Sequence, residues 1–184
     1  MGESTHPITL PPEVEAVFHK FWTCEFSTLA KDGTPITWPV LPIFQPASSR
    51  FVFLTSIGTP QKVFNIRRNR HVSLFYSDPT GSGLIDPPAV LVQGEAQVGD
   101  QIITSMAQVD QQMRLDMQEQ GRRLLKQQPA IAVYIKNRLT QYLMDWYFMR
   151  LLIVITPRRI LWWGERDQNA PAHGIEVKDV ESYR

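Results

Sequence analysis

The sequence lacks the features that mark secreted, membrane and nucleic-acid-binding proteins. It contains a single cysteine, Cys24, which excludes an intramolecular disulfide framework and a cysteine-rich metal site. Its 19 basic residues nearly balance its 18 acidic ones, so no strongly basic surface is expected for nucleic acid or an anionic membrane. The N-terminus has no basic segment followed by an apolar run, and LLIVI at 151–155 is far too short to cross a bilayer. These absences predict a soluble cytoplasmic protein.

Signatures of the common catalytic sites are absent too. The chain has no GxSxG, HExxH, Walker or GxGxxG motif. Its histidines, at 6, 19, 71 and 173, are scattered and predict neither a metal site nor a nucleophile dyad. If the protein is an enzyme, we therefore expect a bound cofactor to carry the reactivity, and the sequence identifies no catalytic side chain.

The pattern of apolar residues predicts one α+β domain that spans residues 1–184. A short amphipathic helix over 11–21 is followed by strands, the first two of which are joined by an Asp-Gly turn. Gly94 inside one strand predicts a bulge or a bend. A helical insertion, whose methionines suit core or dimer packing, follows at about 100–144. The predicted strands cover 23–30, 35–44, 50–56, 71–78 and 88–98, and two closing strands flank a turn at 156–159.

A helix is predicted over residues 59–69. Thr59 can cap its first turn, and Pro60 suits the first helical position. It should end near Asn69, a residue that tolerates the left-handed conformation common at helix C-termini. Lys62 then lies in the first turn, where the helix dipole makes a cation unfavourable by about 0.3–1 kcal/mol unless an anion lies beside it.

Several groups at the start of this helix could bind that anion. The first backbone N–H groups of a helix are free, the ammonium of Lys62 is close by, and hydroxyls are available at Thr55, Ser56 and Thr59. Together they predict a phosphate or carboxylate site. The alternative is a solvated lysine on an exposed turn. Arg67 and Arg68, at the other end of the helix, suit solvated charges near the negative end of the dipole.

These segments resemble a known family. The run FVFLTSIGTPQKVFNIRRNRHVSLFYSD (51–78) is similar to the flavin-binding core of the pyridoxamine 5′-phosphate oxidase-like split β-barrel proteins. FSTLAKDGTPITWPVLPIF (26–44) resembles the first hairpin of that family, and VLVQGEAQV (90–98) resembles its strand with a central glycine. The resemblance covers roughly residues 12 to 100, and ITPRRILWWGE (155–165) matches the closing strands more loosely.

The resemblance implies a split β-barrel of mostly antiparallel strands and a homodimer that holds FMN or a deazaflavin at the subunit interface. The charge balance, the single cysteine and the scattered histidines predict no nucleic-acid or membrane partner and no metal, and the small-molecule substrate stays unknown. The residues that the resemblance assigns to the cofactor are Lys62, with Gln61 beside it, for the phosphate; Thr55 and Ser56 for supporting hydrogen bonds; Thr37, Trp38, Pro39 and Val40 along the isoalloxazine; and, of the pair Trp162 and Trp163, Trp163 near the cofactor of the partner.

The chain departs from the family at the predicted phosphate site. The true oxidases carry Ser-Arg-Lys where this chain has Pro60-Gln61-Lys62, and they carry Arg and Lys in the strand that reads ITWPVLPIF here. Two phosphate-binding cations are therefore missing. The favoured function is an FMN-dependent oxidoreductase that transfers hydride through the flavin. The alternatives are a deazaflavin-dependent reductase and a non-catalytic protein that binds flavin or haem.

Overall fold

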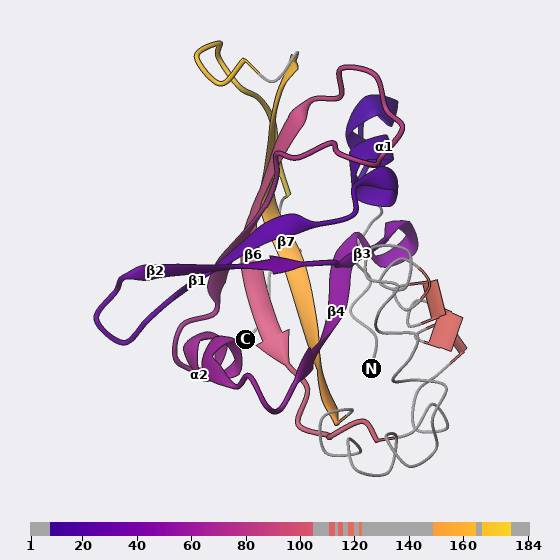
Figure 1. Ribbon diagram of the computed structural model, residues 1–184. Coiled ribbons are helices and arrows are strands. Elements are labelled where there is room, and N and C mark those ends of the chain that lie inside the picture. Colours follow the sequence, from indigo (N-terminus) through magenta and orange to yellow (C-terminus); the bar gives the residue numbers. More distant parts are fainter. Residues whose placement is uncertain are drawn as a thin grey trace, which may run out of the picture.

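The computed structural model describes residues 8–104, 149–164 and 167–177, together with 111–112, 114–115, 118–119 and 122. Within these residues the chain forms the helices α1 and α2 and eight strands (Figure 1), and residues 111–112, 114–115, 118–119 and 122 are also helical, as predicted for the insertion. No helix of the described part is long and apolar enough to span a membrane. The helices are α1 (Pro12–Lys20) and α2 (Gln61–Arg68), and a short 3₁₀ helix η1 covers Pro46–Ser48.

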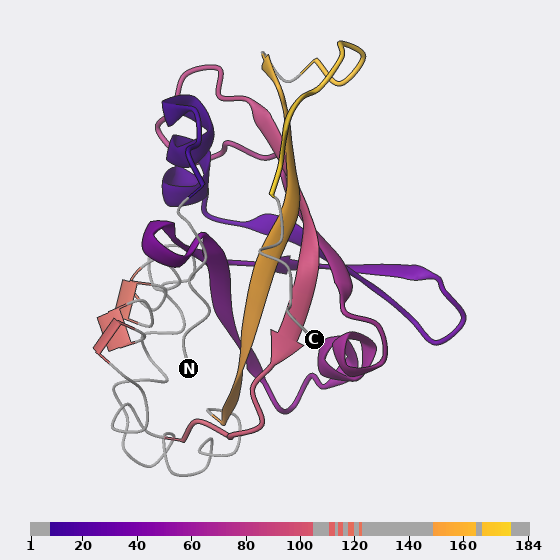
Figure 2. The same ribbon diagram turned by 180° about the vertical axis from the view of Figure 1, so that it is seen from behind.

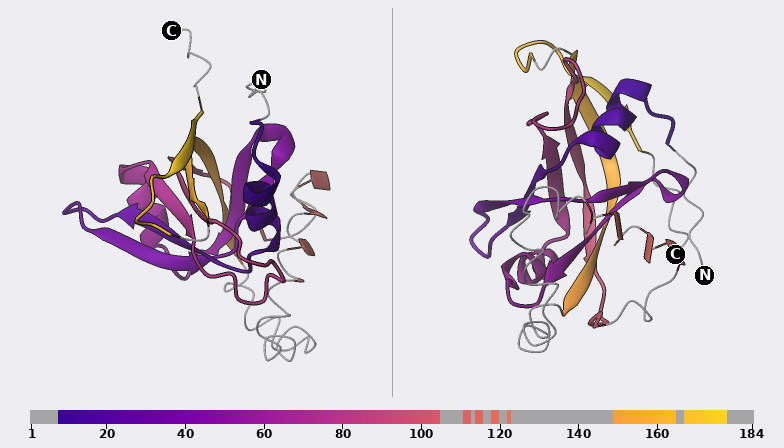
Figure 3. Two further views of the ribbon diagram at one scale, coloured as in Figure 1. Left: turned by 90° about the horizontal axis from the view of Figure 1, so that it is seen from above. Right: turned by 45° about the vertical axis from the view of Figure 1, so that its right-hand side comes forward.

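All eight strands belong to one antiparallel sheet. Seven of them follow the order β2-β1-β5-β6-β7-β4-β3, and β8 pairs with β7 off this path. The sheet curls into a half barrel, so the predicted α+β split-barrel fold is confirmed (Figure 3). The strands are β1 (Cys24–Leu29), β2 (Pro35–Val40), β3 (Ile43–Gln45), β4 (Arg50–Ser56), β5 (His71–Tyr76), β6 (Ala89–Val98), β7 (Arg150–Trp163) and β8 (His173–Glu176).

The two helices lie at opposite ends of the curled sheet, with α1 near β3 and α2 near β1 and β6 (Figure 1). Helix α1 buries an aromatic ring in the core: Phe18 packs edge-on against Phe51 of β4 at 4.8 Å between ring centroids. Phe44 and Tyr76 each lie 5.1 Å from the same ring. A fully buried phenylalanine contributes roughly 1.5–3 kcal/mol, so this cluster is a main source of stability.

The centre of the sheet contains the predicted irregularity at Gly94. The pairing of β6 with β7 shifts here: Gln93 lies opposite Arg159, whereas the next residue, Gly94, lies opposite Pro157. Arg158 is therefore the extra residue of a bulge in β7. A Cβ atom at Gly94 would overlap the carbonyl oxygen of Thr156. Only a glycine permits this close approach of two backbones.

The same pairing corrects the prediction of two closing strands. Residues 156–159 are not a turn, because β7 runs without interruption through them to Trp163 (Figure 2). Proline cannot donate a ladder hydrogen bond, which usually argues against a central strand. Here Pro157 lies at the bulge, where a break in the ladder already exists.

Three further boundaries differ from the prediction. The segment 35–44 forms two strands, β2 and β3, which lie at opposite edges of the sheet. A short strand, β8, covers His173–Glu176, where none was expected. The predicted helix does not begin at Asp100, because Ile103 forms an antiparallel bridge with Arg150. The methionines of the insertion and all of its residues from 123 to 144 lie outside the described residues, and the single-domain assignment stays a prediction.

Candidate functional site

Lys62 is the focus of the candidate site, because it is a nearly buried cation. Its exposed fraction is 9%, and its ammonium lies 5.3 Å from the centroid of the Trp38 ring. Helix α2 contributes the lysine and edge strand β2 contributes the tryptophan. A cation over an indole face gains about 0.5–2 kcal/mol, which offsets only part of the cost of its burial.

The charge of Lys62 has no acidic counterpart within the described residues. No carboxylate of the described residues forms an ion pair or a hydrogen bond with its ammonium. Burial lowers the pKa of Lys62 below its ordinary value of 10.5, because loss of water disfavours the charged form. The first-turn position adds to this cost through the helix dipole. An anion at this point would remove both penalties.

The start of α2 differs in detail from the prediction. The helix begins at Gln61, and its N-cap position is Pro60, which makes no side-chain cap hydrogen bond. Thr59 is therefore not the cap, because its hydroxyl donates to the backbone oxygen of Ser56 at 3.4 Å instead. At the other end, Asn69 terminates the helix as predicted, but in an extended conformation (φ −142°) rather than a left-handed one.

Asn65 fixes the middle of α2 to the sheet. It is fully buried, and its side-chain amide donates to the hydroxyl of Thr28 on β1 at 2.9 Å. Its side-chain oxygen accepts hydrogen bonds from Gln61 at 3.2 Å and from Arg68 at 2.9 Å. This network holds the helix, and with it Lys62, against β1. No sequence-based prediction included this network. An asparagine beside Ile66 on the apolar face of the helix is the signal that could have indicated a buried hydrogen bond.

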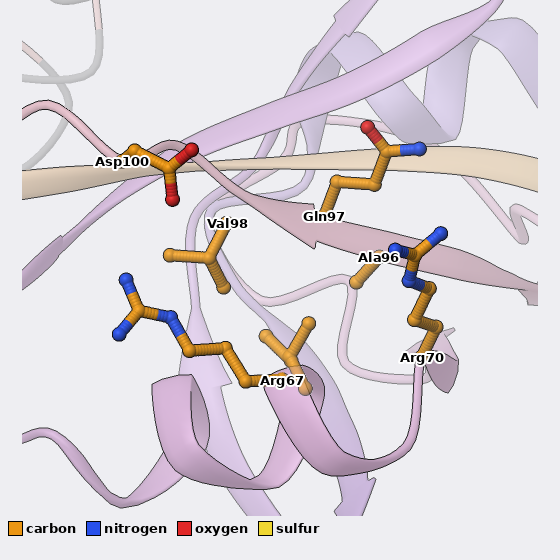
Figure 4. Close-up of a pocket in the computed structure, with 7 residues that line it drawn as sticks. Arg67, Arg70, Ala96, Gln97, Val98 and Asp100 are labelled. Carbon is orange, nitrogen blue, oxygen red and sulfur yellow. The ribbon is translucent and has the colours of Figure 1, made fainter.

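Arg68 is exposed, as predicted, and its guanidinium also forms hydrogen bonds within the chain. One guanidinium nitrogen donates both to Asn65 and, at 3.0 Å, to the backbone oxygen of Leu29. It therefore connects the end of α2 to the end of β1. Arg67, in contrast, lines an open pocket on the other side of the helix (Figure 4).

The other residues predicted at the phosphate site lie at the end of β4 and the start of α2. Thr55 is buried, whereas Ser56 is half-buried and its hydroxyl accepts a hydrogen bond from the backbone N–H of Gly58 at 3.2 Å. Gln61 is exposed and, as described, directs its amide to Asn65. The chain thus gathers hydroxyl, amide and ammonium groups around one short turn.

The segment 37–40 presents its side chains to two faces. Trp38 and Val40 pack against the core, whereas Thr37 and Pro39 are exposed. The hydroxyl of Thr37 shares a hydrogen bond of 2.7 Å with that of Ser27 on the outer face. Of these four residues, Trp38 is the one that contacts Lys62.

Trp163 is distant from Lys62 within one chain. It pairs with Ala89 at one end of β7, whereas Ser56 pairs with Arg150 at the other end. Thirteen residue steps of an extended strand separate these ends by roughly 40 Å. The predicted role of Trp163 concerns the cofactor of a partner subunit, and it stays a prediction. Its neighbour Trp162 packs against the core and stacks on His173 at 5.8 Å.

The groups around Lys62 fit an anion better than a metal ion. The described residues contain no cluster of three or more His, Cys, Asp or Glu side chains that could hold a metal. A phosphate or a carboxylate, by contrast, would find the ammonium of the nearly buried Lys62, free helical N–H groups and the hydroxyl of Ser56. The donor set therefore fits the phosphate of a flavin nucleotide.

Comparison with known proteins identifies the fold. No protein-family profile and no curated protein matches the sequence. Solved structures do match: a protein related to general stress protein 26, of the pyridoxinephosphate oxidase family, from Clostridium acetobutylicum has a TM-score of 0.54 at 9% identity, over 90% of this chain and 92% of that one. A conserved hypothetical protein from Mycobacterium tuberculosis has a TM-score of 0.54 at 18% identity, over 97% and 99%.

A third similar structure is a haem-binding protein from Mycobacterium smegmatis. It has a TM-score of 0.53 at 14% identity and covers 92% of this chain, which in turn spans 60% of that protein. Identities this low establish architecture and leave the ligand open, since proteins of one fold host different functions. The chain has the split-barrel fold of the pyridoxamine 5′-phosphate oxidase-like proteins.

Proposed function

We propose that this chain binds FMN, with the phosphate at the start of α2, and that it acts as a flavin-dependent oxidoreductase. The observation that carries the proposal is the nearly buried side chain of Lys62, whose ammonium has no acidic partner among the described residues. A dianionic phosphate at this point would offset both the desolvation and the unfavourable helix dipole. The fold supports the choice of ligand, because a similar structure belongs to the pyridoxinephosphate oxidase family.

Each part of the site would have a separate task. Lys62 would bind the phosphate, and the network around Asn65 would hold the lysine in place. Ser56 and the first N–H groups of α2 would supply further donors. When bound, a flavin supplies hydride transfer, while the protein orients it and limits its contact with water.

The test compares FMN with riboflavin, which lacks the phosphate. Lys62→Met keeps most of the apolar length of the side chain and removes the charge. We expect it to weaken FMN binding by about 1.5–3 kcal/mol, roughly ten- to a hundredfold, and to leave riboflavin binding nearly unchanged. Titration calorimetry on both variants measures these affinities. Lys31→Met, at the exposed tip of the β1–β2 turn, is the matched control.

Equal losses for FMN and riboflavin would contradict the phosphate assignment. Unchanged affinity for FMN would leave Lys62 as a structural lysine and would overturn the proposal. Oxidoreductase activity is measured separately, as reduction of bound FMN by a nicotinamide donor followed by its reoxidation. Tight binding of FMN without any turnover would retain the binding site and reject the enzyme.

Haem is the second candidate, because a similar structure binds it. Its propionate groups could meet the same lysine. A deazaflavin is also compatible, since it can carry the same kind of phosphate. The absorption spectrum of the protein titrated with each compound distinguishes the three, and Soret-band formation at equimolar haem without affinity for FMN would favour the haem-binding alternative.

We also propose that the site is completed in a homodimer. Phe64, on α2 two residues after Lys62, leaves 54% of its surface exposed, and contact with a second copy of the chain would remove this apolar surface from water. A stable dimer interface commonly buries more than about 1,000 Å². Light scattering should give the mass of a dimer at micromolar concentration, and Phe64→Glu should shift it toward the monomer. A wild-type monomer would contradict the dimer.

A further inference from the structure

A pocket opens at the far end of α2, between that helix and the end of β6 (Figure 4). Its volume is about 340 Å³, at the small end of the roughly 300–1,000 Å³ range of ligand pockets. Its floor is apolar: Ile66 is 1% exposed and Ala96 is fully buried. Polar side chains surround this floor. Arg67 comes from the last turn of α2 and Arg70 from just after it, whereas Gln97 comes from β6 and Asp100 from just after that strand.

The two arginines have no ionic partner in the part of the chain that the structure describes. Neither Arg67 nor Arg70 forms an ion pair or a side-chain hydrogen bond within the described part of the chain, although Asp100 lines the same pocket. Arg68, which lies between them in sequence, instead donates hydrogen bonds to Asn65 and to the backbone oxygen of Leu29. Two guanidinium groups thus share one small pocket with a single carboxylate.

The backbone that carries these arginines is fixed. The N–H of Ala96 donates to the backbone oxygen of Arg70 at 2.8 Å, and the N–H of His71 donates to the side-chain oxygen of Asn69 at 3.0 Å. Helix α2 ends at Arg68 against β1. The backbone of both arginines is therefore held in place on either side of the apolar floor. Binding a ligand would order only their side chains, which limits the entropic cost of binding.

The helix dipole alone does not account for this arrangement. A cation in the last turn gains about 0.3–1 kcal/mol, which suits Arg67. Arg70 lies beyond the helix, where this effect has largely decayed. The shared pocket, its buried floor and the amide of Gln97 are features that a solvated helix-end charge does not require.

We propose that this pocket binds a small organic dianion, with one acid group for each arginine and a short apolar body over Ile66 and Ala96. Carboxylate and phosphate both match the planar fork of a guanidinium. Asp100 restricts the site, because its charge repels ligands with further negative groups near it. The pocket is distinct from the Lys62 site, since the two lie at opposite ends of a helix about 12 Å long.

The test is a titration with succinate, inorganic phosphate and the neutral analogue succinamide, observed by backbone amide chemical shifts. We expect succinate to shift the amides of residues 66–71 and 94–100. Arg67→Gln and Arg70→Gln should each weaken binding about tenfold. Asp100→Asn should strengthen it several-fold by removal of like-charge repulsion. Phosphate that binds more tightly than succinate, with the same dependence on the arginines, would identify the acid as phosphate.

Two controls separate this proposal from the flavin site. Lys31→Gln removes an exposed cation elsewhere, and Lys62→Met removes the cation of the other site; both should leave succinate binding unchanged. The proposal is overturned if neither succinate nor phosphate binds at 10 mM, a trial concentration roughly tenfold above a weak millimolar Kd. It is also overturned if succinamide binds as well as succinate, or if the arginine variants bind like the wild type.

Discussion

The two ends of α2 present positive charge in opposite ways. At its start, Lys62 is nearly buried against an indole ring, at the end where the dipole disfavours a cation. At its far end, Arg67 and Arg70 are exposed beside an open pocket, and water can solvate them. The comparison shows that burial decides whether a charge needs a ligand: the start of the helix is destabilised without one, whereas the far end tolerates its absence.

Asn65 connects the two ends, and its removal should have the largest effect. Asn65→Ala leaves the buried hydroxyl of Thr28 without this donor and takes an acceptor from Arg68. We expect a loss of about 2–3 kcal/mol in the free energy of unfolding, because unsatisfied buried polar groups are costly. Urea denaturation measures the loss. Lys31→Ala, at the exposed tip of the β1–β2 turn, is the control. Equal losses for the two variants would show that the hydrogen bonds of Asn65 do not stabilise the fold.

The second expected effect is a gain in stability. Lys62→Met should raise the free energy of unfolding of the ligand-free protein by up to about 1 kcal/mol, because it removes a desolvated cation from the positive end of the helix. Thermal unfolding without ligand and with saturating FMN measures it. With FMN the order of stabilities should reverse. A variant that is less stable than the wild type without ligand would show that the ammonium already has adequate partners.

The third effect depends on pH. Burial lowers the pKa of Lys62 below 10.5, so between the lowered value and 10.5 the folded protein binds fewer protons than the unfolded chain. The contribution of Lys62 to stability must therefore rise with pH through that window. The advantage of Lys62→Met should shrink accordingly as the pH approaches 10.5. Urea denaturation of both variants at a series of alkaline pH values measures this difference, and a constant difference would exclude a lowered pKa.

The smallest effect is expected at Thr59. Its hydroxyl makes one long hydrogen bond to the Ser56 oxygen and does not cap the helix. Thr59→Ala should therefore cost less than about 0.5 kcal/mol, below the roughly 1 kcal/mol typical of a lost cap. A thermal melt of this variant provides the measurement. A cost of 1 kcal/mol or more would restore the sequence-based assignment of Thr59 as the N-cap.

Local signals in the sequence predicted the elements that depend on neighbouring residues. The Asp32-Gly33 turn defined the β1–β2 hairpin, and the spacing of Val14, Val17 and Phe18 defined α1. The continuity of β7 could not be predicted in this way. A proline in a polar run is typical of a turn, and only its partner Gly94, more than sixty residues earlier, makes Pro157 acceptable in a strand.

In the candidate site, too, the features set by neighbouring residues were predicted, whereas the contacts between distant segments were not. The position of Lys62 in the first turn of α2 follows from adjacent residues, and the prediction of that turn is confirmed. The approach of Trp38 to its ammonium and the hydrogen bond between Asn65 and Thr28 join segments that are distant in sequence. The resemblance to a family placed Trp38 near the cofactor, but no pattern in the residues predicted its contact with Lys62.

The long strand β7 also affects how the chain can fold during its synthesis. It is the partner of β4, β6 and β8, and it begins at Arg150, more than fifty residues after β6 ends. While a ribosome is still producing the insertion, β4 and β6 therefore expose the edges that β7 will later occupy. Such unpaired edges favour aggregation, and pairing over long sequence separations is slow. The central position of a late strand thus leaves two strand edges of the nascent chain open to non-native pairing until β7 has been synthesised.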